Sequence, residues 1–238
     1  MILILTGAGI SRESGLDTFR DPDGIWARVR MEDVGTAGAY ARNPEQVLAF
    51  ANTLRRELLA PRIAPNAAHH ALARLERESR EAVLLVTQNV DNLHERAGSV
   101  HLLHMHGELL KIRCTRCGMV RQWEEDVTLA TACPECAERG RLRPHIVWFE
   151  ETPFHLREIE RALARCRVFV SIGTSGNVWP AAGFAGQARA GGAFVLELNL
   201  ERSLGTRAFH EGRYGRATEI VPAWVEEALA TSRWTSST

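Results

Sequence analysis

Four cysteines in the middle of the sequence have the types and spacing of a metal site. Cys114 and Cys117 form one C-x-x-C pair, and Cys133 and Cys136 form a second pair fifteen residues further on. This is the spacing of a zinc ribbon, in which two pairs of thiolates bind one tetrahedral ion. Four free thiols on a loop would be reactive and would serve no packing purpose. We therefore expect one structural Zn2+ bound by these four side chains.

Two histidines, His104 and His106, precede the first cysteine pair at the end of the strand-like segment 99–105. Four thiolates already complete the coordination of zinc, so neither histidine is needed as a ligand. The two alternate along the chain, so in a strand their side chains point to the same side. A lone histidine at a strand end is most often structural, and we expect that role for His104. The polar loops at residues 7–9, 87–91 and 172–176 favour a catalytic role for His106.

The composition is that of a globular protein large enough for one α/β domain with a smaller insertion. Of 238 residues, 45% are hydrophobic, and 29 basic residues balance 29 acidic ones. Balanced charge gives no general attraction to nucleic acid or to anionic membranes, and the apolar run at residues 1–11 is too short for a signal or membrane segment. We expect a cytoplasmic monomer without membrane or specific nucleic-acid partners. In the reducing cytosol, paired cysteines favour a metal site over disulfides.

Short apolar runs alternate with helical patterns along most of the chain. Runs of Val, Ile and Leu predict buried strands at residues 2–6, 82–87, 168–173, 193–199 and 219–221. Amphipathic patterns predict helices, two of them with proline in the first turn, at residues 65–80, 156–166, 178–190 and 222–230. This alternation is typical of an α/β fold with a parallel sheet wound with helices.

Two stretches interrupt the alternation and predict a second, smaller lobe. Residues 22–64 look helical without strands, and residues 108–145 are short, polar and rich in cysteine. We predict that the first stretch forms a helical module and the second a zinc-ribbon module of the small lobe. The remaining ranges, 1–21, 65–107 and 146–238, then form the large domain.

Three polar loops follow predicted strands and point to a nucleotide site. Residues 7–9 (GAG), 87–91 (TQNVD) and 172–176 (IGTSG) come after successive strands. The carboxyl ends of parallel strands meet at one edge of the sheet, where ligands bind in open α/β folds. A glycine-rich turn from a strand into a helix also brings backbone N–H groups against a phosphate. Arg12 replaces the third glycine of the usual dinucleotide motif, so the turn alone is a weak signal and the convergence of three loops carries the prediction.

Together these motifs resemble the sirtuins, NAD-dependent protein lysine deacylases, and in particular the short bacterial class that includes desuccinylases. The resemblance runs in order from residue 2 to about residue 230 and rests on the two C-x-x-C pairs and on GAGIS (7–11), SGLDTFR (14–20), TQNVDNLHERAG (87–98), HMHGEL (104–109), GTSGNVWPAAG (173–183) and ELNLE (197–201). It implies a Rossmann-type NAD-binding domain and a small lobe made of the helical module and the zinc ribbon. Between them it implies a cleft for NAD and an extended acyl-lysine peptide.

The resemblance also implies which residues bind NAD. They are Gly7, Ala8, Gly9, Ile10 and Ser11 in the phosphate turn; Gly173, Thr174, Ser175, Asn199, Leu200 and Glu201 around the adenosine half; Ala217 at the adenine; Gln88, Asn89, Val90 and Asp91 in the nicotinamide and ribose pocket; and Phe19, Arg20 and Trp26 at the loop that closes over the base. In this arrangement Asp91 accepts a hydrogen bond from the carboxamide. Asn89 and Asp91 could also simply cap the following helix, which is compatible with ligand binding.

His106, with Asn89, corresponds to the catalytic residues of the family. In the reaction that the resemblance implies, the acyl amide oxygen attacks the ribose carbon as nicotinamide leaves, and His106 takes a proton from a ribose hydroxyl. The deprotonated hydroxyl oxygen then attacks the resulting imidate, and water completes the transfer, so that the products are free lysine, nicotinamide and O-acyl-ADP-ribose. Histidine suits this step because its pKa lies near working pH.

The implied substrate-binding residues include two departures from the family pattern. The set is Gly35, Ala51, Leu54, Val147, Trp148, Phe149 and Val178. Desuccinylating members carry Tyr-x-x-Arg where this chain has Ala51 and Leu54, so we expect acetyl and longer aliphatic acyl groups to be preferred over succinyl and malonyl groups. Glu150 stands where the family has glycine, in a segment that pairs with the substrate backbone by β-strand addition.

Two other functions remain open at this point. A mono-ADP-ribosyltransferase would use the same NAD pocket, although the presence of His106 argues for deacylation. A zinc-ribbon binding module without enzymatic activity would need a basic face on the ribbon. Six arginines gather there but alternate with acidic residues: Arg113, Arg116, Arg121, Arg139, Arg141 and Arg143, against Glu124, Glu125, Asp126, Glu135 and Glu138.

Overall fold

The structure, a computed structural model, describes residues 1–18, 25 and 29–230. Its larger sheet has the strand order β3-β2-β1-β7-β8-β9, and every pairing in it is parallel. The strands are β1 (Ile2–Thr6), β2 (Val83–Thr87), β3 (Leu102–His104), β7 (Val168–Ile172), β8 (Phe194–Asn199) and β9 (Glu211–Tyr214). The α/β fold class with a parallel sheet is confirmed.

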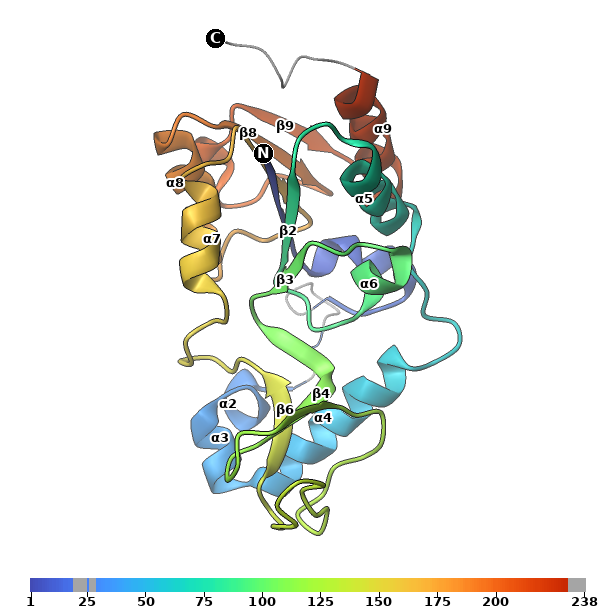
Figure 1. Ribbon diagram of the computed structural model, residues 1–238, viewed down its shortest axis with the longest axis vertical. Helices are drawn as coiled ribbons and strands as arrows, with labels where there is room; N and C mark the ends of the chain where they lie inside the picture. Colours follow the sequence, from blue (N-terminus) through green and yellow to red (C-terminus); the bar gives the residue numbers. More distant parts are fainter. Residues whose placement is uncertain (19–24, 26–28, 231–238) are drawn as a thin grey trace.

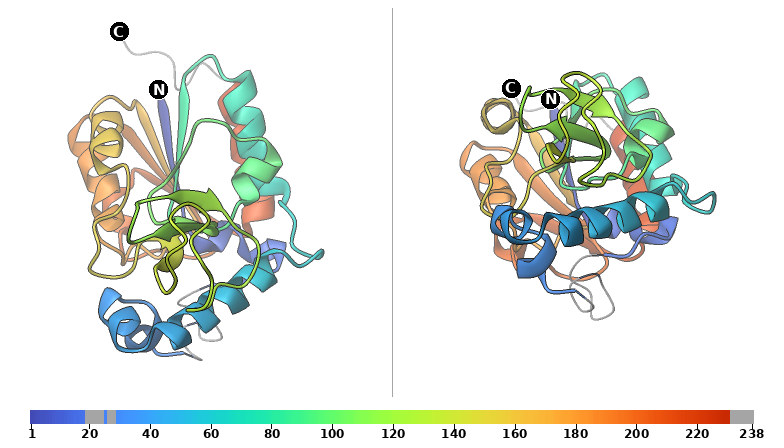
Figure 2. Two further views of the ribbon diagram at one scale, coloured as in Figure 1. Left: turned by 60° about the horizontal axis from the view of Figure 1, so that its bottom comes forward. Right: turned by 90° about the horizontal axis from the view of Figure 1, so that it is seen from below.

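Helices cover both faces of this sheet, as Figures 1 and 2 show. Helices α5 (Ala67–Glu78) and α9 (Ala217–Ala230) lie on one face, and α7 (Leu156–Leu163) and α8 (Phe184–Ala190) on the other. Because both faces are covered, the central strands are continuous apolar runs without alternation. Every residue of β1 and β7 is buried.

The carboxyl-terminal part of the large sheet differs from the prediction. Residues 219–221 are not a strand but lie within α9, whose buried residues Val221, Trp224 and Val225 have helical spacing. The edge strand is β9, whose sequence EGRY is too polar to be recognised as a buried strand. The expected prolines are also placed differently. Pro222 lies inside α9, and the residue after Pro65, Asn66, caps α5 by accepting a hydrogen bond from the Ala68 N–H at 3.0 Å.

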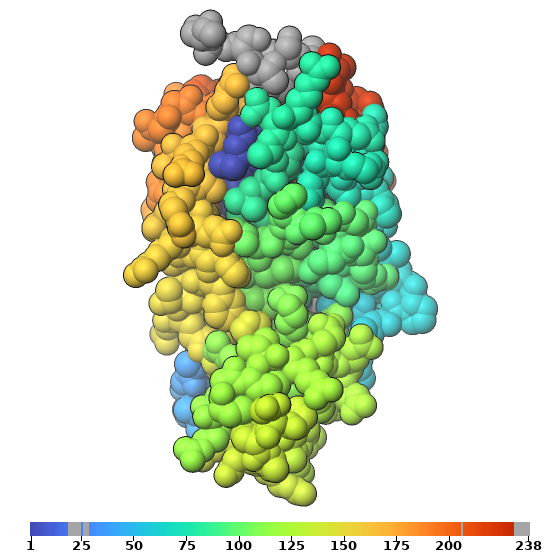
Figure 3. Space-filling model, viewed as in Figure 1, coloured from blue at the N-terminus to red at the C-terminus, as the bar shows by residue number. Residues whose placement is uncertain are grey.

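The small lobe combines three helices with an antiparallel sheet of order β5-β4-β6. Its elements are α2 (Met31–Val34), α3 (Ala37–Arg42), α4 (Pro44–Leu58), β4 (Gly107–Cys114), β5 (Val120–Gln122) and β6 (Leu142–Ile146). Helix α4 begins with Pro44 after the N-cap Asn43, and its Leu48 shares a core with Ile112 and Leu142 of the sheet. In the space-filling view this lobe forms the lower part of the molecule (Figure 3).

One short connection, Met105 and His106, leads directly from β3 of the large sheet into β4 of the small sheet. His106 therefore lies where the two lobes join. Helix α6 (Leu93–Ala97) follows the polar loop after β2. None of the helices within the described residues has the length and apolar character needed to cross a membrane.

Candidate functional site

A cavity of about 1200 Å³ lies between the two lobes. One wall, the cofactor wall, is formed by the loops after β1, β2, β7 and β8, which leave the same edge of the parallel sheet. The opposite wall, the substrate wall, is formed by α4, by Val34 and Gly35, and by the segment after β6. Convergence of these loops is the arrangement that the strand order requires.

Most of the residues chosen from the sequence line this cavity. On the cofactor wall they are Gly7, Ala8, Gly9, Gln88, Asn89, Val90, Gly173, Thr174, Ser175, Asn199, Leu200, Glu201 and Ala217. On the substrate side they are His106, Gly35, Ala51, Leu54, Val147, Trp148, Phe149 and Val178. Three do not line it, because Ile10, Ser11 and Asp91 are buried beneath it. Phe19, Arg20 and Trp26 lie outside the described residues.

The glycine turn after β1 packs tightly against the loop after β7. A Cβ on Gly9 would come within 2.8 Å of the Gly173 Cα, and a Cβ on Gly7 within 2.8 Å of the Gly173 carbonyl oxygen. The Gly9 N–H donates to that same oxygen at 2.9 Å. The glycines are therefore needed for the contact between the two loops. The turn continues into two short 3₁₀ turns, Ala8–Ile10 and Arg12–Ser14, instead of the expected helix.

Several backbone N–H groups of the cofactor wall are available to bind a phosphate. The N–H groups of Gly7, Gly9 and Gly173 are used inside the fold. Those of Ala8, Thr174 and Ser175 have no partner within the described part of the chain, and all three residues line the cavity. Adjacent unpaired N–H groups form an anion-binding concavity, so the residues present fit the pyrophosphate of a dinucleotide.

His106 reaches the cavity in a defined tautomer. Its Nδ1–H donates to the carbonyl oxygen of Gln88 at 3.0 Å, which leaves the lone pair on Nε2. Among the described residues Nε2 has no partner, and the side chain lines the cavity. Burial lowers the pKa of His106, and the hydrogen bond to Gln88 partly offsets this. A neutral imidazole with a free Nε2 is able to act as a general base.

Asn89 is fixed near His106, and its side-chain oxygen accepts no hydrogen bond from the residues that the structure describes. Its Nδ2 donates to the Gly7 carbonyl and to Ser11 Oγ, both at 3.1 Å. Its backbone N–H donates to Thr87 Oγ1 at 3.0 Å. Since both amide hydrogens are used, Oδ1 is the atom that Asn89 can offer to a ligand in the cavity.

A layer of buried polar groups supports the cofactor wall. Ser11 Oγ donates to Asp91 at 2.9 Å, and the Leu93 N–H donates to the other carboxylate oxygen at 3.0 Å. Asp91 thus binds the first N–H of α6, although the N-cap of that helix is Asn92, and both oxygens of Asp91 are used inside the protein. Burial raises the pKa of Asp91. Burial also lowers the pKa of His69 to about 3 and holds that of His94 well below its ordinary value, so both imidazoles are neutral.

His104 supports the same loop from behind. Its Nδ1–H donates to the carbonyl oxygen of Asn89 at 3.2 Å, and its Nε2 lies 2.7 Å from the Glu95 carboxylate. Burial lowers the pKa of His104, but the hydrogen bond and charge of Glu95 outweigh burial and raise it overall. The two alternating histidines thus hold consecutive carbonyls, those of Gln88 and Asn89.

The substrate wall is apolar where α4 faces the cavity. Val47, Phe50, Ala51 and Leu54 form this face. The neighbouring arginines of α4 point elsewhere. Arg55 is fully buried against the zinc-ribbon module, where it donates to the Leu109 and Glu125 carbonyls and to Asn52, and Arg56 pairs with Asp126 at 2.5 Å. Tyr40 donates to the Leu142 carbonyl at 3.0 Å. None of these three residues lines the cavity.

The segment after β6 is fixed between the two lobes. The Val147 N–H donates to the His106 carbonyl at 2.8 Å, and the Phe149 N–H donates to the Gly35 carbonyl at 2.9 Å. The Glu151 carboxylate accepts hydrogen bonds from Nη1 and Nη2 of Arg143 at 2.6 and 2.9 Å. The same guanidinium lies 3.2 Å from the centre of the Trp148 ring. Glu150 has a φ of 75°, so the turn keeps the left-handed conformation without glycine.

The four cysteines come together at distances that fit zinc. The Sγ atoms of Cys114 and Cys136, and those of Cys117 and Cys133, are each 3.8 Å apart, and all four lie within 4.8 Å of one another. A tetrahedron with Zn–S bonds of about 2.3 Å has S–S edges of about 3.8 Å. The cluster is therefore a closed structural zinc site, as the spacing predicts.

Sequence reasoning missed several cavity residues. Val47 precedes Ala51, and Phe50 precedes Leu54, by one helical turn of four positions, so the helical period could have identified them. Trp179 lies within the recognised motif 173–183 and is 76% exposed. Arg202 and Arg216 belong to loops after β8 and β9, and no sequence signal distinguishes them from ordinary surface arginines.

Comparison with known proteins agrees with this geometry. The model of the Sir2 family matches residues 7–180. The chain is 53% identical to the NAD-dependent protein deacylase SIR2rp3 of Leishmania major, over 97% of this chain and 96% of that protein. It is 52% identical to an NAD-dependent protein deacylase of Escherichia coli (strain K12), over 96% of this chain and 82% of that protein.

Solved structures give the same result. A complex of a Sir2 homologue with NAD has a TM-score of 0.86 at 35% identity, covering 95% of this chain and 88% of that one. A complex of Sir2 with a p53 peptide and NAD+ has a TM-score of 0.80 at 28% identity, covering 97% and 94%. The chain belongs to the Sir2 family, and the resemblance to the sirtuins is confirmed.

Proposed function

We propose that this chain, an NAD-dependent protein deacylase, removes acetyl and longer aliphatic acyl groups from protein lysines with His106 as its general base. The free Nε2 of His106, facing a cavity between a nucleotide-type wall and an apolar wall, is the observation that carries this assignment. NAD is the co-substrate, and one structural Zn2+ is bound by the four cysteines. We further propose that the protein acts as a monomer in the cytoplasm.

The side chains around the cavity support distinct tasks. When bound, NAD supplies an electrophilic ribose carbon and nicotinamide as the leaving group. His106 Nε2 accepts a proton from a hydroxyl placed in the cavity, while the Gln88 carbonyl keeps the required tautomer. Asn89 Oδ1 is held to orient the ligand, and the α4 face keeps water away from the acyl chain.

Mass spectrometry tests the proposed reaction. Incubation with NAD and an acetyl-lysine peptide should give the deacetylated peptide, nicotinamide and O-acetyl-ADP-ribose. ADP-ribosylated protein without deacetylation would favour the transferase alternative. Unchanged NAD and peptide would favour the zinc-ribbon binding module.

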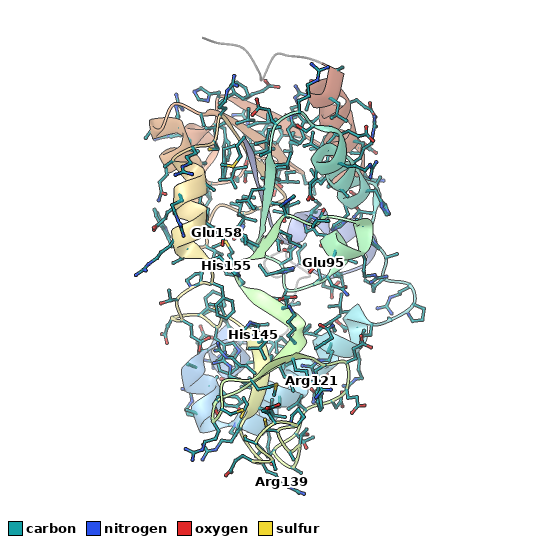
Figure 4. The ribbon with its side chains drawn as sticks, viewed as in Figure 1. Glu95, Arg121, Arg139, His145, His155 and Glu158 are labelled. Atoms are coloured by element: carbon teal, nitrogen blue, oxygen red, sulfur yellow. The ribbon has the colours of Figure 1, made fainter. Side chains whose placement is uncertain are left out.

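The binding-module alternative has a specific surface to offer. Arg121 in β5 and Arg139 are exposed on the outside of the small lobe (Figure 4). Exposed acidic residues interrupt this surface, among them Glu124, Glu125 and Glu138. Mixed charge gives weak, unspecific attraction to nucleic acid, so the deacylase function accounts better for the chain.

A further inference from the structure

The substrate wall carries an acidic side chain, Glu150, without a polar partner among the residues that the structure describes. Glu150 is exposed and lines the cavity. Within the described residues it forms no hydrogen bond and no ion pair. Its neighbour Glu151 accepts hydrogen bonds from Arg143, from Arg113 at 3.4 Å and from the Trp148 N–H, so its charge is neutralised inside the protein. The negative charge of Glu150 is therefore available to interact with a molecule bound in the cavity.

The backbone at Glu150 is unfavourable for this residue. Its φ of 75° lies in the left-handed region, where a Cβ costs free energy that glycine avoids. Unfavourable backbone conformations of this kind occur preferentially at functional sites. A side chain held there without a hydrogen bond or ion pair to the described residues is therefore a candidate for binding.

Glu150 lies within electrostatic range of the residues next to an acyl-lysine. Val147 is hydrogen-bonded to the His106 carbonyl, and three residues of chain reach at most about 10 Å. An extended peptide advances about 3.3 Å per residue. Glu150 and peptide residues up to three positions from the acyl-lysine thus each lie at most about 10 Å from the His106 region, which is comparable with a Debye length of roughly 8 Å.

The other charged cavity residues belong to the cofactor wall. They are Arg12, Glu13, Glu201, Arg202 and Arg216. Glu13 accepts hydrogen bonds from Thr218 at the start of α9. Glu201 and Arg202 follow β8, which is three strands from β2 and hence about 14 Å away. Among the described charged residues that line the cavity on the substrate side, Glu150 is thus the one without an ion pair.

We propose that Glu150 selects substrates with lysine or arginine close to the acyl-lysine and disfavours acidic neighbours. This inference rests on the proposed deacylase function and names its substrate class. An exposed ion pair is weak, so we expect about a two- to fivefold gain in kcat/KM over neutral neighbours, with a comparable loss for acidic neighbours. The preference should shrink as salt screens the charges.

Three acetyl-lysine peptides that differ only in the flanking residues, arginine, alanine or glutamate, provide the test. For the wild type, kcat/KM should fall in that order, and the differences should shrink at high salt. Glu150→Gln keeps the size of the side chain and should abolish the order, as should Glu150→Gly. Glu160→Gln, an equal change of charge at an exposed site on α7, the helix that also carries Glu158 in Figure 4, should preserve it.

The outcomes separate the two proposals. Equal kcat/KM for the three peptides, or an unchanged order in Glu150→Gln, would overturn the role of Glu150 while leaving deacylation intact. If the wild type consumed none of the peptides in the presence of NAD, the deacylase function would fail and the inference with it.

Discussion

The cofactor wall of the cleft is polar and densely hydrogen-bonded, whereas the substrate wall is apolar where α4 forms it. At the rim of the substrate wall, the Glu150 carboxylate has no polar partner among the described residues. Asn89 donates hydrogen bonds to three other residues, and Asp91 beneath it is buried and bonded through both oxygens. On the other wall, Leu54 and Glu150 have no polar contact within the described residues. Substituting a residue within a buried hydrogen-bond network costs much stability. Substitutions that alter substrate specificity are therefore tolerated more easily on the substrate wall.

Removing a zinc ligand should have the largest effect, because the metal supports the substrate wall from behind. Cys114 and Cys133 share a core with Leu48 of α4, the helix that forms that wall. Binding of structural zinc supplies about 10–16 kcal/mol in small zinc modules. We expect Cys133→Ala to lose zinc, unfold the small lobe and lose activity. Metal analysis, circular dichroism and the deacetylation assay measure these effects.

The control for this variant is Cys166→Ala, which removes a buried thiol outside the cluster. It should retain zinc and most of its activity. A Cys133→Ala protein that kept its fold and turnover after chelation would show that the small lobe does not depend on the metal.

Replacing the base comes next and should affect chemistry without affecting the cofactor wall. His106→Ala should lower kcat by about 10²–10⁴-fold, while NAD binding, measured by calorimetry, stays near the wild-type value. His70→Ala removes an exposed histidine from α5 and should change neither quantity. Near-normal turnover by His106→Ala would exclude it as the base.

The sequence predicts the cofactor wall better than the substrate wall. Buried strands such as β1 and β7 have a continuous apolar pattern, and the loops after them carry recognisable motifs, so the fold and most of the cofactor wall follow from the sequence. The four cysteines were equally clear. The edge strand β9 was missed because one polar strand of four residues has no distinctive pattern. Segment 219–221 was misassigned because a run as short as Ile220-Val221 fits a strand and a helix alike.

The finer site could not be predicted because it depends on tertiary contacts. Nothing in the sequence shows that Gly9 is needed for its contact with Gly173, or that Arg55 turns away from the acyl channel. The roles of the site residues and the division into lobes at residues 22–64 and 108–145 stay predictions.

The acyl preference should come from the apolar face of α4. On one peptide, acetyl-lysine and decanoyl-lysine should have a higher kcat/KM than succinyl-lysine. Hydrogen bonds to a charged group are worth about 1.5–3 kcal/mol each, so a missing tyrosine and arginine correspond to roughly two decades of preference. The double variant Ala51→Tyr with Leu54→Arg should raise succinyl activity, and Ala49→Tyr with Thr53→Arg, on exposed positions of α4, should not. A succinyl preference in the wild type would contradict this interpretation.

The buried histidines beneath the cofactor wall should make stability depend on pH. The folded state holds the pKa of His94 well below its ordinary value, so between pH 6.5 and 5 the unfolded state binds a proton that the folded state excludes. Stability is fully present above about pH 6.5 and falls on acidification by up to about 1.4 kcal/mol per pH unit for this histidine.

Urea unfolding between pH 6.5 and 5 measures this slope. Other groups oppose it, because His104 has a raised pKa, so the informative quantity is the difference between variants. His94→Gln should reduce the slope, and His70→Gln, on the surface of α5, should leave it unchanged. Equal slopes for all three proteins would show that His94 is not buried in its neutral form.

The smallest effect should come from removing the backbone strain at Glu150, at the rim of the substrate wall. A non-glycine residue at φ 75° costs about 1–2 kcal/mol, and glycine gives back about 0.5–1 kcal/mol through the entropy of the unfolded chain. Glu150→Gly should therefore stabilise the protein by about 0.5–1 kcal/mol, or raise Tm by about 1–4 °C for a chain of this size. Glu150→Gln keeps the Cβ and should show no gain, which separates backbone relief from loss of charge. If the glycine variant melted at or below the wild-type temperature, the turn would not be strained. A gain in stability together with a loss of charge preference among peptides would show that the chain retains an unfavourable backbone conformation in order to hold a carboxylate beside its substrate.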